Sequence, residues 1–208
     1  MVEACTWLWL DTCLCSPLSR SSAAFQLLKP VKTLNGKAVE IAAGLRHALA
    51  VTAEKGLVFQ WGVGMKSLAN RGLQTLPVPA FMSAREPCEV PGFGHVKVKH
   101  VSAGAYHSAC ITDQGWLFVW GSNKYGQLLS SDDFLPLPFF IQPHHFEGEK
   151  ITLVRSGWTH IVARTGNVKL FVLICLQKNA FLTIYLWVYG LRQNTLCKPT
   201  YQPIRRFR

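Results

Sequence analysis

Three histidines stand in the same short sequence context along this chain of 208 residues. Imidazole is a common metal ligand and general base near neutral pH, so a recurring histidine could mark a reactive site. Each histidine follows a glycine by three residues and precedes a threonine by five. The three copies contain Gly44 and His47, Gly104 and His107, and Gly157 and His160. A motif that recurs at intervals of 60 and 53 residues is typical of a repeat architecture.

The segments around the histidines predict short β-strands joined by tight turns. Residues 47–51 and 107–111 are rich in small and β-branched side chains, as expected of buried strands. Each is followed by polar residues and a glycine, Gly56 or Gly115, which can adopt the positive φ that a hairpin turn requires. A second apolar strand then ends in Trp-Gly, at Trp61 and Gly62 and at Trp120 and Gly121. Short antiparallel strands with periodic glycine and tryptophan indicate a β-propeller.

A propeller changes the interpretation of the three histidines. Successive blades are rotated about a common axis, so equivalent residues form a ring and do not meet at one reacting atom. We therefore interpret His47, His107 and His160 as buried residues that hydrogen-bond to neighbouring backbone, because buried polar groups need partners. The same argument favours a packing role for Trp61 and Trp120 over a ligand cage. The glycine of each motif is predicted to allow a close approach of the backbone near the centre.

The repeated residues resemble those of the regulator of chromosome condensation family. The resemblance rests on the Ala-Gly-x-x-His motif, on the Leu-Phe-Val-Trp-Gly strand at residues 117–121 and on residues 122–128, which include Gly126. It extends over residues 26–172. Members of this family form seven-bladed propellers. The resemblance therefore implies an all-β fold, here a partial β-propeller of about two to three blades of four-stranded antiparallel sheet.

The resemblance also divides the chain into three segments. Residues 1–25 and 173–208 match no repeat, and we expect the first to be disordered and the second to be a non-propeller extension that is apolar and then basic. Between them lie the expected repeats, with a partial unit at 39–55 and further units at 56–112 and 115–165. The third copy lacks Trp-Gly after Val172. The chain thus resembles a central portion of a longer propeller, with exposed strand edges and marginal stability.

The formal net charge is +11, and much of the excess lies near the C-terminus. From Arg155 to Arg208 the sequence contains nine lysines and arginines and no acidic residue. This segment could be a basic arm for phosphate or lipid headgroups, or a basic tail without a partner. It has neither helical spacing nor the interleaved aromatic residues of single-strand binders, which favours the tail. Nucleic acid is therefore not specifically implied as a partner.

Neither of two apolar stretches predicts a membrane span or a leader. Residues 170–189 are long enough to cross a bilayer, but Lys178 near their middle costs about 2.5 to 3.5 kcal/mol on insertion scales. Residues 5–18 contain Asp11 and lack a basic leading segment, so they make a poor signal peptide. We therefore expect a location in the cytoplasm, the nucleus or both, with the seven cysteines as free thiols.

No metal site, cofactor or bond-making chemistry is expected from the sequence. Cys13 and Cys15 lack a second cysteine or histidine pair at zinc-like spacing, and His144 and His145 are isolated. The chain contains no Gly-x-Ser-x-Gly elbow, no phosphate loop and no His-Glu-x-x-His helix.

The family resemblance implies a function in binding. The best-known member is a guanine nucleotide exchange factor for a small Ras-like GTPase, which implies that a propeller face stabilises the nucleotide-free GTPase and so accelerates GDP release. The alternative is a non-catalytic scaffold for protein–protein interaction, because a fold does not determine function. The expected contact loops are residues 65–94 and 130–150. The second loop carries the acidic candidates Asp132, Asp133, Glu147 and Glu149.

Overall fold

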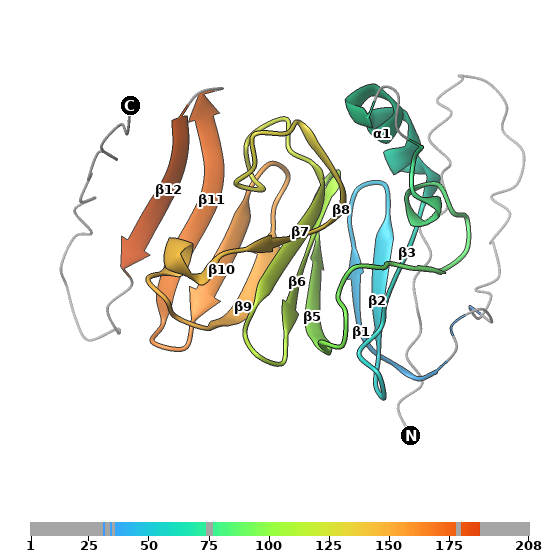
Figure 1. Ribbon diagram of the computed structural model, residues 1–208, viewed down its shortest axis with the longest axis horizontal. Coiled ribbons are helices and arrows are strands. Elements are labelled where there is room, and N and C mark those ends of the chain that lie inside the picture. Colours follow the sequence, from blue (N-terminus) through green and yellow to red (C-terminus); the bar gives the residue numbers. More distant parts are fainter. Residues whose placement is uncertain (1–30, 32–33, 35, 74–76, 178–179, 188–208) are drawn as a thin grey trace, which may run out of the picture.

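The computed structural model describes residues 31, 34, 36–73, 77–177 and 180–187. In these residues, three four-stranded antiparallel sheets stand side by side, and we number them blades 1, 2 and 3 (Figure 1). They confirm the prediction of an all-β partial β-propeller with two to three blades of four-stranded antiparallel sheet. The expected disorder of residues 1–25 lies outside the described residues.

Each blade is a meander in which the strand order follows the sequence. Blade 1 contains β1 (Ala38–Ala43), β2 (Ala48–Thr52), β3 (Val58–Trp61) and β4 (Cys88–Glu89). Blade 2 contains β5 (Val98–Ala103), β6 (His107–Thr112), β7 (Leu117–Ser122) and β8 (Phe134–Ile141). Blade 3 contains β9 (Ile151–Ser156), β10 (Ile161–Thr165), β11 (Lys169–Gln177) and β12 (Ala180–Trp187). The first strands of neighbouring blades, β1, β5 and β9, pack beside one another.

The hydrophobic core lies in the seams between blades. β6 and β7 are buried along their full length, since blades 1 and 3 cover blade 2 on both faces. The small and β-branched residues of these strands allow the sheets to approach closely. One cluster of buried side chains, with Leu49 and Trp120, fills the seam between blades 1 and 2. A second, with Ile111 and Phe171, fills the seam between blades 2 and 3.

A long connection between β3 and β4 strengthens the first seam. It contains η1 (Val63–Met65), α1 (Lys66–Leu73) and η2 (Ala80–Met82). Met65 and Phe81 are buried in the same cluster as Trp120 of blade 2. Because α1 also contacts β7 and β8, the connection ties blade 1 to its neighbour.

The threonine of each motif closes the turn between the second and third strands of its blade. The Thr52, Thr112 and Thr165 hydroxyls accept hydrogen bonds from the backbone N–H groups of residues 57, 116 and 169 at 3.2, 3.1 and 3.2 Å. The same contact in three turns explains why threonine recurs five residues after each histidine. A side-chain acceptor of this kind replaces water for a backbone donor at a tight turn.

The Thr112→Val variant is expected to lose about 1 kcal/mol of unfolding free energy, because the shape is kept and one buried hydrogen bond is lost. Urea denaturation would measure the change. Thr152→Val is the matched control, since the Thr152 hydroxyl likewise bonds to the backbone, donating to the Arg164 carbonyl at 3.1 Å, but in an exposed position. Equal midpoints for wild type and Thr112→Val would contradict the turn-closing role.

The sheet of blade 3 extends beyond the boundary expected at residue 173. β11 continues past residue 173 and pairs with β12. Lys169 lies opposite Trp187 at one end of the pair, and Gln177 lies opposite Ala180 at the other. The missing Trp-Gly does not end the sheet, because the pairing of two antiparallel strands uses backbone groups. Residues 188–208 lie outside the described residues, and the division of the chain into three segments stays a prediction.

Blade 1 exposes the face of β1 that points away from blade 2. Ile41, Val101 and Val154 hold equivalent positions, three residues before the motif glycine, and are 43%, 2% and 0% exposed. Val101 and Val154 are buried in the seams with the preceding blades, whereas the described residues provide no such blade for Ile41. Full burial of a side chain of this size contributes about 1.5 to 3 kcal/mol. The open flank therefore lacks part of the stabilisation that an inner blade has.

Candidate functional site

The first repeated histidine lies in a buried polar network between blades 1 and 2. His47 Nε2 is 2.9 Å from Ser108 Oγ on β6. The Ser108 hydroxyl donates to Gln60 Oε1 at 3.3 Å, and the Trp120 indole N–H donates to the same oxygen at 2.7 Å. Because the single hydroxyl hydrogen of Ser108 is used toward Gln60, Nε2 of His47 must carry the proton and donate.

Burial keeps the imidazoles of His47 and His107 neutral. Desolvation, with a smaller contribution from His107, lowers the pKa of His47 to about 3. Desolvation also lowers the pKa of His107 to about 4; the backbone of His160 partly opposes this change and the His160 imidazole adds to it. The side chains of His47 and His107 are 5% and 0% exposed. These two groups are therefore out of reach of a substrate, and they lie in different seams.

The network is not repeated in the second seam. Ile161 stands where blade 2 has Ser108, and Val119 stands where blade 1 has Gln60. Leu173 correspondingly holds the place of Trp120 and is buried in one cluster with Val119. An indole N–H buried without an acceptor would cost about 1 to 3 kcal/mol. The absence of Trp-Gly in the third copy thus fits an apolar seam.

The motif glycines make room for the histidine rings. Each glycine N–H donates to the carbonyl of its histidine, at 2.8, 2.8 and 2.9 Å for Gly44, Gly104 and Gly157. A Cβ at any of the three positions would collide with the imidazole of the same motif. At Gly104 it would also lie 2.7 Å from the carbonyl oxygen of Gly157 in the next blade. The glycines thus lie where neighbouring blades come close together.

The Trp-Gly pairs pack beside the histidine motifs. Trp61 and Trp120 are buried, and the following Gly62 and Gly121 have φ values of 120° and 102°. A Cβ at these glycines would meet the backbone carbonyls of the residues before His47 and His107, at 2.5 and 2.6 Å. Gly126, with φ 64°, donates its N–H to the Asn123 carbonyl at 2.8 Å. The assignment of all these residues as a structural signature of the repeat stays a prediction.

The loops after the first strand of each blade, and after the third strands of blades 1 and 2, lie at one end of the blades. Gly64 touches the side chain of Arg46, and the Ser122 N–H donates to the Tyr106 carbonyl at 2.8 Å. We call this end the loop face, and it comprises residues 44–47, 62–66, 104–107, 122–133 and 157–160. The turns after the second strands and the linkers between blades form the other end, the turn face (Figure 1).

The loop face carries exposed side chains of the types that anchor protein interfaces. Leu45, Tyr125 and Trp158 are 47%, 46% and 63% exposed. The Lys124 ammonium lies 5.6 Å from the centre of the Tyr125 ring. Tryptophan and tyrosine are enriched among the residues that dominate binding energy at interfaces. This face therefore offers apolar anchors beside a positive charge.

The structure separates the four acidic candidates into two pairs. Asp132 and Asp133 are exposed on the loop face, in the connection from β7 to β8. Glu147 and Glu149 follow η3 (Pro143–Phe146) on the turn face, where both bind the Lys169 ammonium, Glu149 at 2.7 Å. Hydrogen bonding to Lys169 lowers the pKa of Glu149, and Glu147 and Glu149 raise the pKa of Lys169. The four residues therefore do not form one contact surface, and their role in partner binding stays a prediction.

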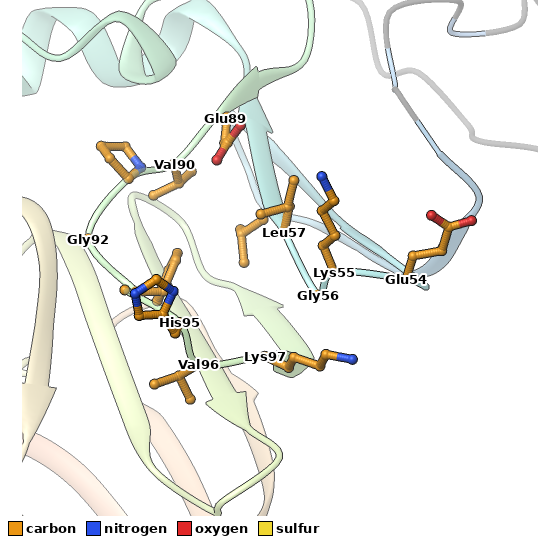
Figure 2. Close-up of a pocket in the computed structure, with 14 residues that line it drawn as sticks. Glu54, Lys55, Gly56, Leu57, Glu89, Val90, Gly92, His95, Val96 and Lys97 are labelled. Atoms are coloured by element: carbon orange, nitrogen blue, oxygen red, sulfur yellow. The ribbon is translucent and has the colours of Figure 1, made fainter.

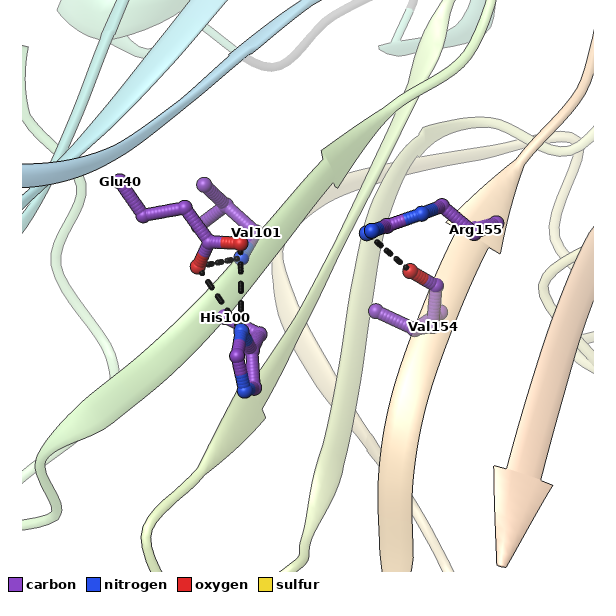
Figure 3. A network of polar contacts seen from close by, with 5 residues as sticks. All are labelled: Glu40, His100, Val101, Val154 and Arg155. Atoms are coloured by element: carbon purple, nitrogen blue, oxygen red, sulfur yellow. Dashed lines mark hydrogen bonds and ion pairs between the residues drawn. The ribbon is translucent and has the colours of Figure 1, made fainter. Parts of the chain in front are cut away.

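Sequence reasoning missed a second polar link between blades 1 and 2. The Glu40 carboxylate lies 3.2 Å from His100 Nδ1 through each oxygen and accepts the Val101 N–H at 3.1 Å (Figure 3). In blade 3, Arg155 donates to the carbonyl of its neighbour Val154 at 3.3 Å. Glu40 and His100 each stand four residues before their motif glycine. That shared position is the signal that could have identified the pair.

The described part of the chain provides neither of two other kinds of site. It has no helix with the length and apolar character needed to cross a membrane. Nor does it bring three or more histidine, cysteine, aspartate or glutamate side chains together in a way that could hold a metal ion.

Comparison with known proteins gives the class of this fold. Residues 98–127, from β5 into the loop after β7, match the Regulator of chromosome condensation (RCC1) repeat. The chain is thus a partial β-propeller that contains a repeat of the RCC1 type.

Among individual proteins, the chain is 50% identical over 141 residues to the secretion-regulating guanine nucleotide exchange factor of Mus musculus, a match that covers 68% of this chain and 30% of that protein. It is 34% identical over 137 residues to the E3 ubiquitin-protein ligase HERC2 of Homo sapiens, covering 65% of this chain and 3% of the ligase. The chain therefore spans 30% of the length of the exchange factors that it matches.

Two solved structures share the fold at low sequence identity. Human WBSCR16 aligns with a TM-score of 0.56 and 24% identity, over 68% of this chain and 34% of that one. Prp20p of Saccharomyces cerevisiae aligns with a TM-score of 0.52 and 20% identity, over 65% and 32% of the two chains.

Proposed function

We propose that this chain is a guanine nucleotide exchange regulator of a small GTPase, or a fragment of one. The observation that carries the proposal is its 50% identity over 141 residues to a secretion-regulating guanine nucleotide exchange factor. The proposed location is the cytoplasm, the nucleus or both. The partner is a protein, and the proposal requires neither nucleic acid nor a membrane span.

The proposed mechanism is differential binding. An exchange regulator binds the nucleotide-free GTPase more tightly than the nucleotide-bound form, which shifts the equilibrium toward release of GDP. To speed release tenfold, the regulator must favour the transition state for release over the bound state by about 1.4 kcal/mol. No side chain of the regulator has to react. The buried, neutral His47 and His107 fit such a role, since they contribute to the scaffold.

The loop face is the proposed contact surface. Leu45 and Trp158 are exposed in motif loops at this end, and Tyr125 extends the apolar surface onto the loop after β7. Asp132 and Asp133 add negative charge on that same loop. The turn face exposes fewer large apolar side chains among the described residues, with Trp116 and Val168 in its turns. The proposal therefore assigns the GTPase to the loop face.

Stimulated GDP release tests both parts of the proposal. The full chain, titrated against a panel of small GTPases loaded with fluorescent GDP, is expected to accelerate release for at least one of them. Trp158→Ser is expected to reduce that acceleration at least tenfold, since an exposed tryptophan is a typical anchor. Val168→Ser, an exposed apolar residue on the turn face, is the matched control.

Three outcomes separate the possibilities. No acceleration at any concentration would overturn exchange activity. Acceleration that survives Trp158→Ser would overturn the loop face as the contact surface and leave the activity in place. Stable binding of a partner without acceleration would favour the second candidate, a non-catalytic interaction scaffold. That candidate is supported by the 34% identity to an E3 ubiquitin-protein ligase, because a protein named for another activity contains a similar sequence.

A further inference from the structure

The outer strands of the three blades differ in the edge that they present to another chain. Among the described residues, the fourth strand of each blade has a hydrogen-bonded neighbour on one side alone. The N–H and C=O groups on the other side of such a strand can pair with a further strand. Soluble proteins protect these edges by keeping them short or by placing proline or charged residues along them.

The outer edges of blades 1 and 2 have this protection. β4 contains two residues, and beyond Val90 the linker leaves the sheet and lines a pocket against the turn from β2 to β3 (Figure 2). β8 is eight residues long but contains Pro136 and Pro138, which have no N–H to donate. Both edges are therefore poor templates for another strand.

The outer edge of blade 3 lacks both kinds of protection. β12 is eight residues long, with the sequence AFLTIYLW, and contains no proline, glycine or charged residue. The nearest charged residues along the chain are Lys178 and Arg192. β-Branched and aromatic residues favour extended strands, and a long, uncharged edge of this composition readily pairs with another strand.

We propose that β12 pairs with β12 of a second copy of this chain, in antiparallel orientation, to form a dimer. The pairing joins the two copies of blade 3 into one continuous sheet of eight strands. Like charges that lie opposite each other destabilise a strand pair, and β12 has no charged residue that would oppose its own copy. The second copy also supplies an edge of the same length, so almost the whole strand can be paired.

The geometry of an antiparallel pair restricts the register of this dimer. Along β12, the backbone groups that point away from β11 belong to every second residue. Two such strands can bond only when these residues lie opposite each other, which places one residue of β12 opposite itself on a two-fold axis. With Thr183 or Ile184 on the axis, seven of the eight residues are paired. Because both copies use the same surface, association stops at the dimer.

The dimer does not depend on the proposed exchange activity. β12 and the inner strand β9 lie at opposite edges of blade 3, so the free edge of β12 faces outward from the row of blades. The loop face of each copy therefore stays accessible, and a GTPase could bind to it in the dimer.

Sedimentation velocity of the full chain tests the proposal. The monomer has a mass of 23.3 kDa, and the sedimenting mass is expected to double as the protein concentration rises through the micromolar range. Hydrogen exchange locates the contact, because amides that enter a sheet exchange more slowly. Exchange within residues 180–187 is expected to slow at least tenfold in the dimer. Residues 134–141 of β8, the edge that contains two prolines, are the matched control and are expected to exchange at the same rate in both states.

Proline substitutions at two adjacent positions provide a second test. Of Thr183→Pro and Ile184→Pro, one removes an N–H that points toward β11 and the other removes an N–H that points away from it. The second kind of variant is expected to raise the dissociation constant of the dimer at least tenfold with an unchanged circular dichroism spectrum. Thr183→Val and Ile184→Val keep the N–H, and these controls are expected to dimerise as wild type does.

Four results would overturn the proposal. The chain could sediment as a monomer throughout the micromolar range, or it could form species larger than a dimer. The slower exchange could appear outside residues 180–187. Finally, both proline variants could dimerise as wild type does, which would place the contact elsewhere.

Discussion

The Gly104→Ala variant is expected to unfold at a much lower urea concentration than the wild-type chain, with a loss of about 3 kcal/mol or more in unfolding free energy. The added methyl group would overlap the His107 imidazole and lie 2.7 Å from the Gly157 carbonyl oxygen. The ring is fully buried, and the carbonyl belongs to the backbone of the next blade, so neither can move without disturbing a seam.

Gly166→Ala is the matched control for this substitution. Gly166 lies in the turn between β10 and β11, has no positive φ, and a Cβ there would meet only Thr152 Cγ2 at 3.8 Å. The control is expected to change the free energy of unfolding by less than about 1 kcal/mol. The change is stabilising if alanine in place of glycine lowers the conformational entropy of the unfolded chain. If both variants unfold at the wild-type midpoint, close packing of the motif glycines does not matter for stability.

Lowering the pH is expected to destabilise the chain, and the loss of stability is expected to begin at pH values well above those at which most carboxylates titrate. The pKa values of His47 and His107, about 3 and about 4, lie below the ordinary value of 6.5 because burial disfavours the charged ring. Between pH 6.5 and these values the unfolded chain binds more protons than the folded chain. The free energy of unfolding therefore falls as the pH falls through this window.

The size of the acid effect follows from the width of that window. One pKa unit corresponds to about 1.4 kcal/mol, so each histidine is expected to remove about 2 to 3 kcal/mol on going from pH 7.5 to pH 4.5. Urea denaturation at the two pH values measures the difference. In the variant with His47→Gln and His107→Gln, the difference is expected to shrink to that of the remaining groups. An undiminished difference would show that other groups cause the acid effect.

The repeat architecture could be predicted from local sequence because its signals recur. The hairpin turns and the Gly-x-x-His motifs are patterns of residues close in sequence, and three copies made the repeat visible. Trp120 could be recognised as a packing residue for the same reason. What it packs against could not be inferred, since its acceptor, Gln60, is 60 residues away and has valine in its place in the next repeat.

The grouping of the acidic candidates could not be predicted from the sequence. Asp132 and Glu147 share one stretch of sequence between β7 and β9, but β8 lies between them. Eight residues of strand carry the chain about 25 Å, from one end of the blade to the other. Likewise, the pairing of Glu147 and Glu149 with Lys169 depends on a turn of the next blade, which no local pattern reports.

The pairs across the two seams make the blades non-interchangeable. Glu40 meets His100 and Gln60 meets Trp120 only where blade 1 precedes blade 2, whereas Ser102 Oγ accepts the Ser156 N–H, at 2.7 Å, where blade 2 precedes blade 3. If the third repeat preceded the second, Val172 would stand in the place of Gln60 and the buried indole N–H of Trp120 would lack an acceptor. Although the repeats share one motif, their side chains encode the order in which they must be joined.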